Sequence, residues 1–139
     1  MNVLIDTSVW SLALRRSPRQ LSPREAATAA EFAELIKEGR ARIIGIIRQE
    51  LLSGIKAQPQ FEKLRDIVRA FPDELVNTAD YEAAALASNQ CRSKGVAVSV
   101  SDMLLCAVAQ SRDWALFSTD PDFSRYAKML PIKLHDVRQ

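Results

Sequence analysis

The sequence contains few of the side chains that build the commonest metal and catalytic sites. In 139 residues it has one histidine, His135, and two cysteines, Cys91 and Cys106. A single histidine leaves no His-based metal site, and it makes a Ser-His-Asp triad a poor fit. Two cysteines 15 positions apart in apolar or Ala-rich stretches indicate neither a disulfide framework nor a zinc cluster. We expect both thiols to be buried and inert, and His135 to lie at the surface.

Long apolar runs and a large charge excess are also absent. No run approaches the ~18 residues that a membrane span needs, and the start MNVLID lacks the basic region and cleavage site of a signal peptide. We therefore expect a cytoplasmic protein that makes no membrane contact. The formal net charge is only +2, short of the excess that by itself marks nucleic-acid binding. The positive charge is unevenly spread, however, because residues 15–24 contain four arginines and no acid.

Short apolar runs alternate with helical patterns along the chain. The length and the 47% hydrophobic content suit one compact domain over residues 1–139. Alternating strands and helices predict a three-layer α/β/α sandwich around a parallel sheet. We expect 96–100 to be a loop or a short extended piece. Strands are predicted at 1–6, 42–46, 74–77, 115–118 and 132–134, and helices from residue 7 and at 23–39, 47–55, 61–71, 79–94, 101–109 and 121–130. The helix at 23–39 is expected to start with a capping box, because Ser22 is followed by Pro23 and, three residues on, by Glu25.

Four acids fall at strand ends or at the start of the central apolar helix. Asp6 ends the first predicted strand, Glu50 follows the second, Asp102 begins the central helix, and Asp120 follows the fourth strand. Ligands of open parallel sheets gather outside the carboxyl ends of the strands, so these acids can converge. Clustered carboxylates repel one another unless a cation lies among them, and oxygen ligands suit Mg²⁺ or Mn²⁺. Such an ion activates water and shields a phosphodiester, which points to metal-assisted phosphoryl hydrolysis.

Each acid also fits a purely structural role. Asp6 and Asp120 can cap the helices that follow them, and Asp102 can complete a capping box. Glu50 can be a solvated helix residue, and Asp122 can complement the dipole of its helix. The arginines can equally form a solvated helix face rather than hold RNA phosphates. The joint placement of the acids at one edge favours the metal site.

Four segments of the sequence resemble the acidic motifs of PIN-domain ribonucleases. They are 4–8 (LIDTS), 48–54 (RQELLSG), 99–109 (SVSDMLLCAVA) and 117–123 (FSTDPDF), and together they span nearly the whole chain. Their order, spacing and overall length most resemble the VapC-type toxins of bacterial toxin–antitoxin systems. The resemblance implies a five-stranded parallel sheet and an Mg²⁺- or Mn²⁺-dependent endoribonuclease. It also implies a homodimer and an antitoxin whose tail can push a basic side chain into the acidic pocket.

The resemblance also assigns roles to particular residues. Asp122 corresponds to a further acid of some members, so the choice between Asp120 and Asp122 as a metal ligand stays open. Residues 15–30 are longer and richer in arginine than in the shortest members, and we expect substrate choice to depend on them. The implied catalytic acids are Asp6, Glu50, Asp102 and Asp120, and these four together with Asp122 form the implied metal pocket. The hydroxyls expected to contact these acids or the phosphate are those of Thr7, Ser8, Ser101 and Ser118. The arginines expected to contact RNA are Arg15, Arg16, Arg19 and Arg48.

Two other functions fit parts of this pattern. A PIN-like domain without catalysis could bind RNA or protein, although nothing then explains why all four acids are kept. A phosphatase or phospho-receiver would carry a second acid two residues after Asp6, or a lysine near Ser118. Position 8 is serine and no lysine lies near Ser118, so this function is disfavoured.

Overall fold

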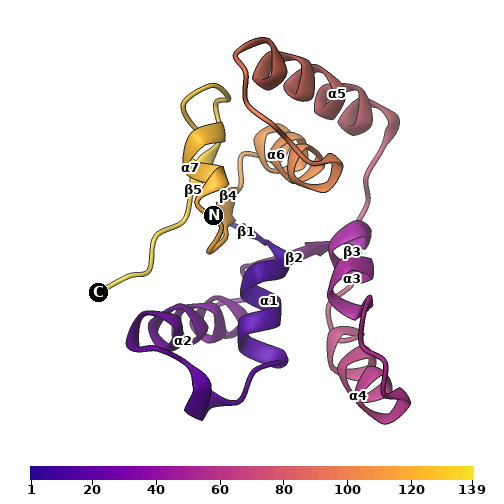
Figure 1. The fold of residues 1–139 in the computed structure, drawn as a ribbon, viewed down its shortest axis with the longest axis vertical. Coiled ribbons are helices and arrows are strands. Elements are labelled where there is room, and N and C mark those ends of the chain that lie inside the picture. The colour runs from indigo at the N-terminus through magenta and orange to yellow at the C-terminus, as the bar shows by residue number, and fades with distance from the viewer.

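Five parallel strands form one sheet at the centre of the computed structural model, which describes residues 1–139 (Figure 1). The strand order is β3-β2-β1-β4-β5, and Val3 of β1 lies opposite Ala41 on one side and Ala115 on the other. The parallel sheet expected from the alternating pattern is therefore confirmed. The strands are β1 (Val3–Ile5), β2 (Ala41–Ile44), β3 (Asp73–Glu74), β4 (Ala115–Phe117) and β5 (Lys133–Leu134).

Helices cover both faces of this sheet. Figure 1 shows α1 (Thr7–Leu14), α2 (Pro23–Lys37), α3 (Gly45–Leu52) and α4 (Gln58–Val68) below the sheet. α5 (Thr78–Ser93), α6 (Val100–Arg112) and the short α7 (Asp122–Tyr126) lie above it. A 3₁₀ turn at Pro18–Gln20 links α1 to α2. This is the predicted three-layer sandwich, and no helix in it is both long and apolar enough to cross a membrane.

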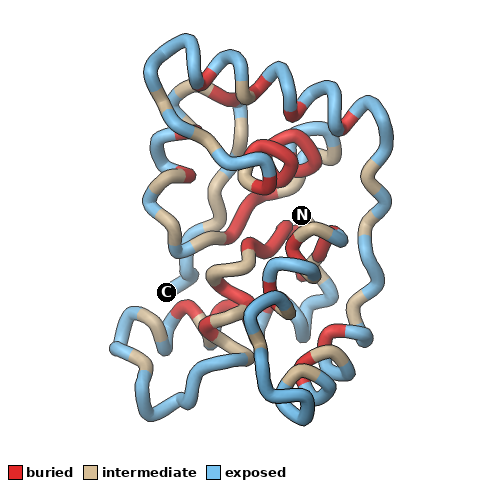
Figure 2. Tube along the Cα trace, turned by 45° about the vertical axis from the view of Figure 1, so that its right-hand side comes forward, coloured by how far each residue is buried: buried red, intermediate tan, exposed pale blue.

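The core runs through β1 and α6. All three residues of β1 have no exposed surface, and α6 is buried continuously over 103–109 (Figure 2). Trp10 of α1 packs edge-on against Phe32 and Phe71, with ring centroids 4.8 and 5.0 Å apart. Cys91 and Cys106 are buried as expected, and desolvation raises the pKa of both thiols. The apolar pattern of the sequence therefore located the central helix correctly.

Side-chain caps fix the starts of α2, α5 and α6. The box predicted at Ser22 is present, because its Oγ accepts from the Glu25 amide and the Glu25 carboxylate accepts from the Ser22 amide. A second box, formed by Asn77 and Asp80, starts α5 and was not foreseen. The predicted strand 74–77 is therefore wrong in its bounds, because β3 covers Asp73–Glu74 and Asn77 caps α5. The predicted strand 42–46 likewise ends at residue 44, because α3 begins at Gly45.

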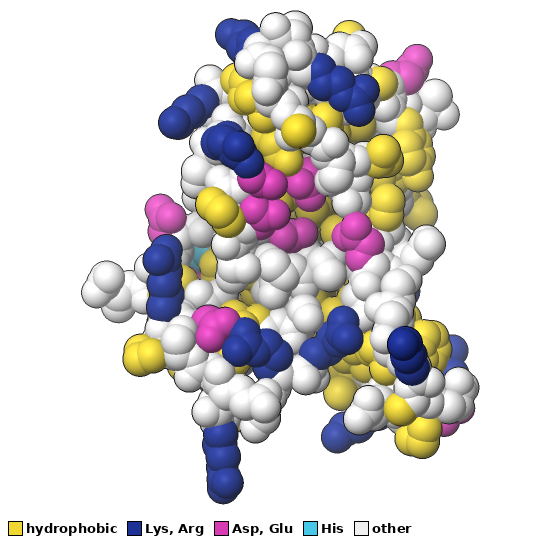
Figure 3. All heavy atoms as spheres, in the orientation of Figure 1, with side chains coloured by type: hydrophobic (Ala, Val, Ile, Leu, Met, Phe, Trp, Pro, Cys, Tyr) yellow, Lys and Arg dark blue, Asp and Glu magenta, His cyan; other side chains and the backbone are white.

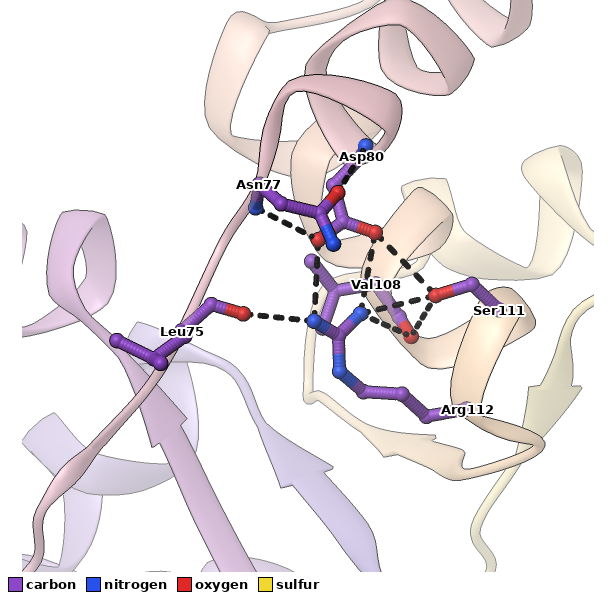
Figure 4. Close-up of polar contacts among 6 residues, drawn as sticks. All are labelled: Leu75, Asn77, Asp80, Val108, Ser111 and Arg112. Atoms are coloured by element: carbon purple, nitrogen blue, oxygen red, sulfur yellow. Dashed lines mark hydrogen bonds and ion pairs between the residues drawn. The ribbon is translucent and has the colours of Figure 1, made fainter.

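A buried ion pair fastens α5 to α6 (Figure 4). Asp80 is only 4% exposed, and its two carboxylate oxygens accept from Nη1 and Nη2 of Arg112 at 3.1 and 3.0 Å. Nη2 of Arg112 also donates to the backbone carbonyl of Leu75 at 2.6 Å. The hydrogen bonds from Arg112 lower the pKa of Asp80 against the opposing effect of burial. This contact joins the β3–α5 connection to the helix that begins near Asp102.

The expectation that His135 lies at the surface is wrong. Its side chain is 10% exposed, and Nε2 lies 2.5 Å from a carboxylate oxygen of Glu31 on α2. Glu31 is 5% exposed and also accepts from Nε of Arg138 at 2.8 Å. Burial opposes the ionisation of Glu31, but the hydrogen bonds from Arg138 and His135 outweigh it and lower the pKa of the carboxyl. The Glu31 carboxylate therefore holds the C-terminal segment against α2, through its contacts with His135 and Arg138.

Candidate metal centre

Three carboxylates meet at the carboxyl edge of the sheet. Asp102 lies in the first turn of α6, Asp120 follows β4, and Asp122 begins α7. One carboxylate oxygen from each of them lies within 4.8 Å of the others. Acidic side chains form a group near the middle of the face drawn in Figure 3, with lysine and arginine side chains above and below. Residues from three separate segments thus bring like charges together.

Asp6 lies at the end of β1 and is 7% exposed. Its Oδ2 accepts from Ser8 Oγ at 2.9 Å and from Ser118 Oγ at 2.7 Å. These hydroxyls are oriented in turn, because Ser8 Oγ accepts from the Thr119 amide and Ser118 Oγ from the Asp120 amide, each at 3.0 Å. Asp6 makes no side-chain cap to α1, so the structural alternative for this residue is not realised. Its carboxylate is instead held by hydroxyls from α1 and from the end of β4.

Asp102 is the acid whose ionisation is most clearly opposed by its surroundings. Burial, followed by the like charges of Asp6 and Asp120, raises its pKa, while the hydroxyl of Tyr126 donates to Oδ2 at 3.0 Å and opposes that rise. Ser99 Oγ accepts from the Asp102 amide at 3.1 Å, which forms half of the predicted capping box. The carboxylate does not complete the box, because it turns to Tyr126. A nearby cation would favour the ionised form of Asp102.

Glu50 connects this cluster to α3. Oε1 accepts from Thr7 Oγ1 and Oε2 accepts from Ser101 Oγ, both at 2.9 Å. The residue is exposed, as its structural alternative expects, yet hydroxyls from α1 and α6 fix both of its oxygens. Asp6 precedes Thr7 and Asp102 follows Ser101, so Glu50 is anchored beside both acids. The carboxylate therefore faces the same edge of the sheet.

Asp120 and Asp122 differ in what they contact. Oδ1 of Asp120 accepts from the Asp122 amide at 2.9 Å, so Asp120 caps the start of α7, which was its structural alternative. Asp122 pairs with Arg125 one turn later on the same short helix. Asp120 has no basic partner. The charge of Asp120 is therefore unpaired, whereas that of Asp122 is offset by Arg125.

Positive charge is scarce around these acids. Of the five, only Asp122 forms an ion pair with a lysine or arginine. Carboxylates brought this close without cations repel one another, so the arrangement favours binding of a positive ion. The donors are all carboxylate and hydroxyl oxygens, which suit Mg²⁺ and Mn²⁺ rather than zinc or copper. The residues present therefore fit the metal that the sequence suggested.

The arginines expected to contact RNA fall into two groups. Arg16 pairs with Glu25, and Arg48 donates to Asp73 Oδ1 at 2.9 Å and to two backbone carbonyls. Arg15 and Arg19 form no ion pair or side-chain hydrogen bond in the protein. The two unpaired residues therefore keep their guanidinium groups available, whereas Arg48 uses its donors inside the fold. The RNA contact predicted for all of them stays a prediction.

Tyr126 is the functional-site contact that sequence reasoning missed. Tyr126 is buried beside Phe123 of the same short helix, with the two rings in edge contact. The direction of the Tyr126 hydroxyl, toward Asp102 on another helix, has no local signal in the sequence.

Comparison with known proteins identifies the family. The sequence matches the PIN domain over residues 3–129. The chain belongs to the PIN-domain family. A search of curated proteins found no match to this PIN-domain chain.

Solved structures share the fold of this PIN domain at low sequence identity. A chain of VapBC2 from Rickettsia felis, solved bound to a promoter DNA fragment, has a TM-score of 0.74 and 17% identity, with 97% of this chain and 98% of that chain covered. VapBC-1 from nontypeable Haemophilus influenzae has a TM-score of 0.72 and 14% identity, with each chain fully covered. VapBC-5 from Mycobacterium tuberculosis, a member of the VapBC family of toxin–antitoxin systems, has a TM-score of 0.68 and 19% identity, with 99% of this chain and 100% of that chain covered. The likeness therefore extends over the whole fold.

Proposed function

We propose that this PIN-domain protein is an Mg²⁺- or Mn²⁺-dependent endoribonuclease that acts in the cytoplasm as the toxin of a toxin–antitoxin pair. The observation that carries the proposal is the cluster of carboxylates at the carboxyl edge of the sheet, which has a single basic partner among five acids. A non-catalytic fold gains no stability from such repulsion. Membership of the PIN family and a fold similar to chains of toxin–antitoxin complexes support the same function.

We assign the metal to Asp6, Asp102 and Asp120, with Asp122 and Glu50 at its margin. When bound, such an ion makes water a better nucleophile and shields the negative charge that develops on a phosphodiester. The hydroxyls of Ser8 and Ser118 hold Asp6 in place. Glu50 is held by two hydroxyls and is exposed, so its carboxylate is available to take a proton from the attacking water.

Cleavage of labelled single-stranded RNA by the purified protein tests this proposal. With Mn²⁺ or Mg²⁺ present, the wild type should cut internal phosphodiester bonds, and EDTA should stop cleavage. Asp6→Asn should lower the rate at least about 100-fold, since removing a metal ligand loses several kcal/mol of transition-state stabilisation. Glu82→Gln, an exposed acid on α5 without a partner, is the matched control and should cut normally. Wild-type cleavage that is unaffected by EDTA or by Asp6→Asn would contradict the metal role.

A binding module without catalysis is the competing function. Calorimetric titration with Mn²⁺ separates the two, because the nuclease must bind the ion and the module has no need of it. Binding that disappears in Asp6→Asn but persists in Glu82→Gln supports the nuclease. A wild-type protein that binds RNA but neither binds Mn²⁺ nor cleaves RNA would be such a module.

We infer that the partner protein is a cognate antitoxin. The carboxylates of the acidic cluster are mostly unpaired and attract positive charge. A basic side chain from an antitoxin would therefore compete with the metal for these carboxylates. The antitoxin should therefore suppress both RNA cleavage and growth arrest when the two proteins are produced together. A basic residue of its tail changed to alanine should weaken the inhibition.

We also propose that the protein forms a homodimer through the apolar surface on and beside α5. Tyr81 and Leu86 of this helix are 58% and 66% exposed, and Leu75 before it is 85% exposed. Large apolar side chains exposed to solvent would be covered if a second copy packed against this region. Sedimentation of the wild type should show a dimer, and Leu86→Glu should shift it to monomer. A wild type that sediments as a monomer would refute the dimer.

A further inference from the structure

A cavity adjoins the acidic cluster. It has a volume of about 710 Å³ and lies between the first half of α2, the end of β4 and the chain that follows β5. Ser118 and Asp120 line it and also belong to the acidic cluster, where Ser118 Oγ donates to Asp6. The cavity and the candidate metal centre therefore share a wall, and one extended molecule can occupy both.

The lining of this cavity suits a planar, amphipathic ligand. Six of its 16 lining residues are hydrophobic, and Thr119 and Ser124 add hydroxyl groups. Small-molecule sites of about 300–1,000 Å³ typically combine apolar walls with a few placed polar groups. An unpaired nucleobase has apolar faces and a polar edge, so it matches this combination.

Arg24 is the one arginine or lysine in the lining of the cavity, which also contains the acids Glu25, Asp120 and Asp136. It lies in the first turn of α2, is exposed, and forms no ion pair or side-chain hydrogen bond. Neighbouring Glu25 is already paired with Arg16, so its charge is offset. A guanidinium group without a partner can stack on a base or contact a phosphate of an RNA strand. Arg24 also falls in the arginine-rich stretch that we expected to govern substrate choice.

His135 supplies a fixed polar group to the lining of the cavity. A carboxylate only accepts hydrogen bonds, so Nε2 donates to Glu31, which leaves Nδ1 free for a hydrogen bond to another group. The ring also packs edge-on against Phe117, with centroids 5.2 Å apart. Two contacts thus hold the imidazole in one orientation, as discrimination between bases requires.

We propose that this cavity is a nucleotide subsite of the ribonuclease. One unpaired base of the RNA strand, next to the phosphodiester at the acidic cluster, enters it between Arg24 and His135. The subsite rests on the proposed function, and it makes these two side chains determinants of which sequence is cut.

Matched substitutions on α2 test the subsite. Ala27 lines the cavity, whereas Ala30 is exposed on the same helix and does not, so Ala27→Trp and Ala30→Trp differ chiefly in whether the cavity is filled. Arg24→Ala is compared with Arg92→Ala, an exposed arginine of α5 that lies outside the cavity. Each variant is first checked for an unchanged melting temperature. It then cleaves a random-sequence single-stranded RNA pool, and the cut ends are sequenced.

We expect Ala27→Trp to lower kcat/KM at least about 10-fold and both cavity variants to change the base preference beside the cut, with both controls within twofold of wild type. A wild type that cleaves with a base preference which neither cavity variant alters overturns the subsite. Binding of a fluorescent RNA decamer to Asp6→Asn separates this from failure of the nuclease itself. The two tryptophan substitutions are also made in the Asp6→Asn protein. If the wild type cuts no RNA, but Ala27→Trp weakens decamer binding tenfold and Ala30→Trp does not, the subsite stands and the nuclease function fails. If no variant binds RNA, both proposals fail.

Discussion

Replacing Asp120 by asparagine should stabilise the protein without metal and destabilise it with metal. Asparagine has nearly the same shape, and its Oδ1 can still accept from the Asp122 amide, so the cap of α7 is kept. The substitution removes one negative charge from the cluster. It therefore isolates electrostatic repulsion from changes in packing.

The size of the effect follows from the spacing of the charges. Carboxylate oxygens of Asp102, Asp120 and Asp122 lie within 4.8 Å of one another. At that distance two unit charges repel by about 3.5 kcal/mol at an effective dielectric constant of 20 and by about 0.9 kcal/mol in bulk water. Asp122 is paired with Arg125 and its side chain is 36% exposed, so the lower value applies. We expect Asp120→Asn to raise the free energy of unfolding by about 1 kcal/mol in EDTA, or about 4 °C in melting temperature.

With metal present, the wild type should be more stable than Asp120→Asn. An ion at ten times its dissociation constant stabilises the folded state by about 1.4 kcal/mol, and the variant that has lost a ligand forfeits most of this gain. Melting curves of both proteins in EDTA and in Mg²⁺ check the reversal, with Glu82→Gln as the control outside the cluster. An Asp120→Asn protein that is less stable in EDTA, or that gains as much from Mg²⁺ as the wild type, would refute the reasoning.

Three further predictions concern stability away from the metal centre. Asp80→Asn breaks the buried ion pair with Arg112 and should lower the free energy of unfolding by about 3 kcal/mol in urea titrations; a loss below about 0.5 kcal/mol would show that the pair contributes little. The lowered pKa of Glu31 means that its stabilising contribution is present above its unfolded pKa and is lost as pH falls through the folded value. Glu31→Gln should therefore be less stable than wild type at pH 7, and melting temperatures should converge in acid; a pH-independent difference would contradict this. Ser22→Ala should cost about 1 kcal/mol by removing the cap of α2, whereas Ser22→Gly should cost only a few tenths, and equal losses would argue against a capping effect.

Features that depend on neighbouring residues were predictable from the sequence. The apolar run before Asp6 predicted β1, and the Ser-Pro-Arg-Glu sequence at Ser22 predicted the start of α2, because strand periodicity and capping boxes act over a few positions. The parallel sheet then implied that Asp6, Asp102 and Asp120 end at one edge. These acids could be grouped without knowing any long-range contact, because ligand sites of parallel sheets lie outside the carboxyl ends of the strands.

Contacts between distant segments were not predictable in the same way. His135 and Glu31 are 104 positions apart, and only the packing of the C-terminal segment against α2 brings them together. Tyr126 reaches Asp102 because α7 lies beside α6, a relation that no periodicity encodes. Arg48 looked like an exposed cation until β3 placed Asp73 beside it. In each case the partner is chosen by tertiary geometry, which local patterns leave open.

The hydroxyls that hold Asp6 and Glu50 have a practical consequence for metal exchange. Ser8 and Ser118 orient one carboxylate, and Thr7 and Ser101 orient the other, through hydrogen bonds that belong to the protein itself. Loading and stripping of a divalent cation should therefore be quick and repeatable, with no refolding between cycles. Protein prepared with chelator would regain its full capacity on simple addition of the salt.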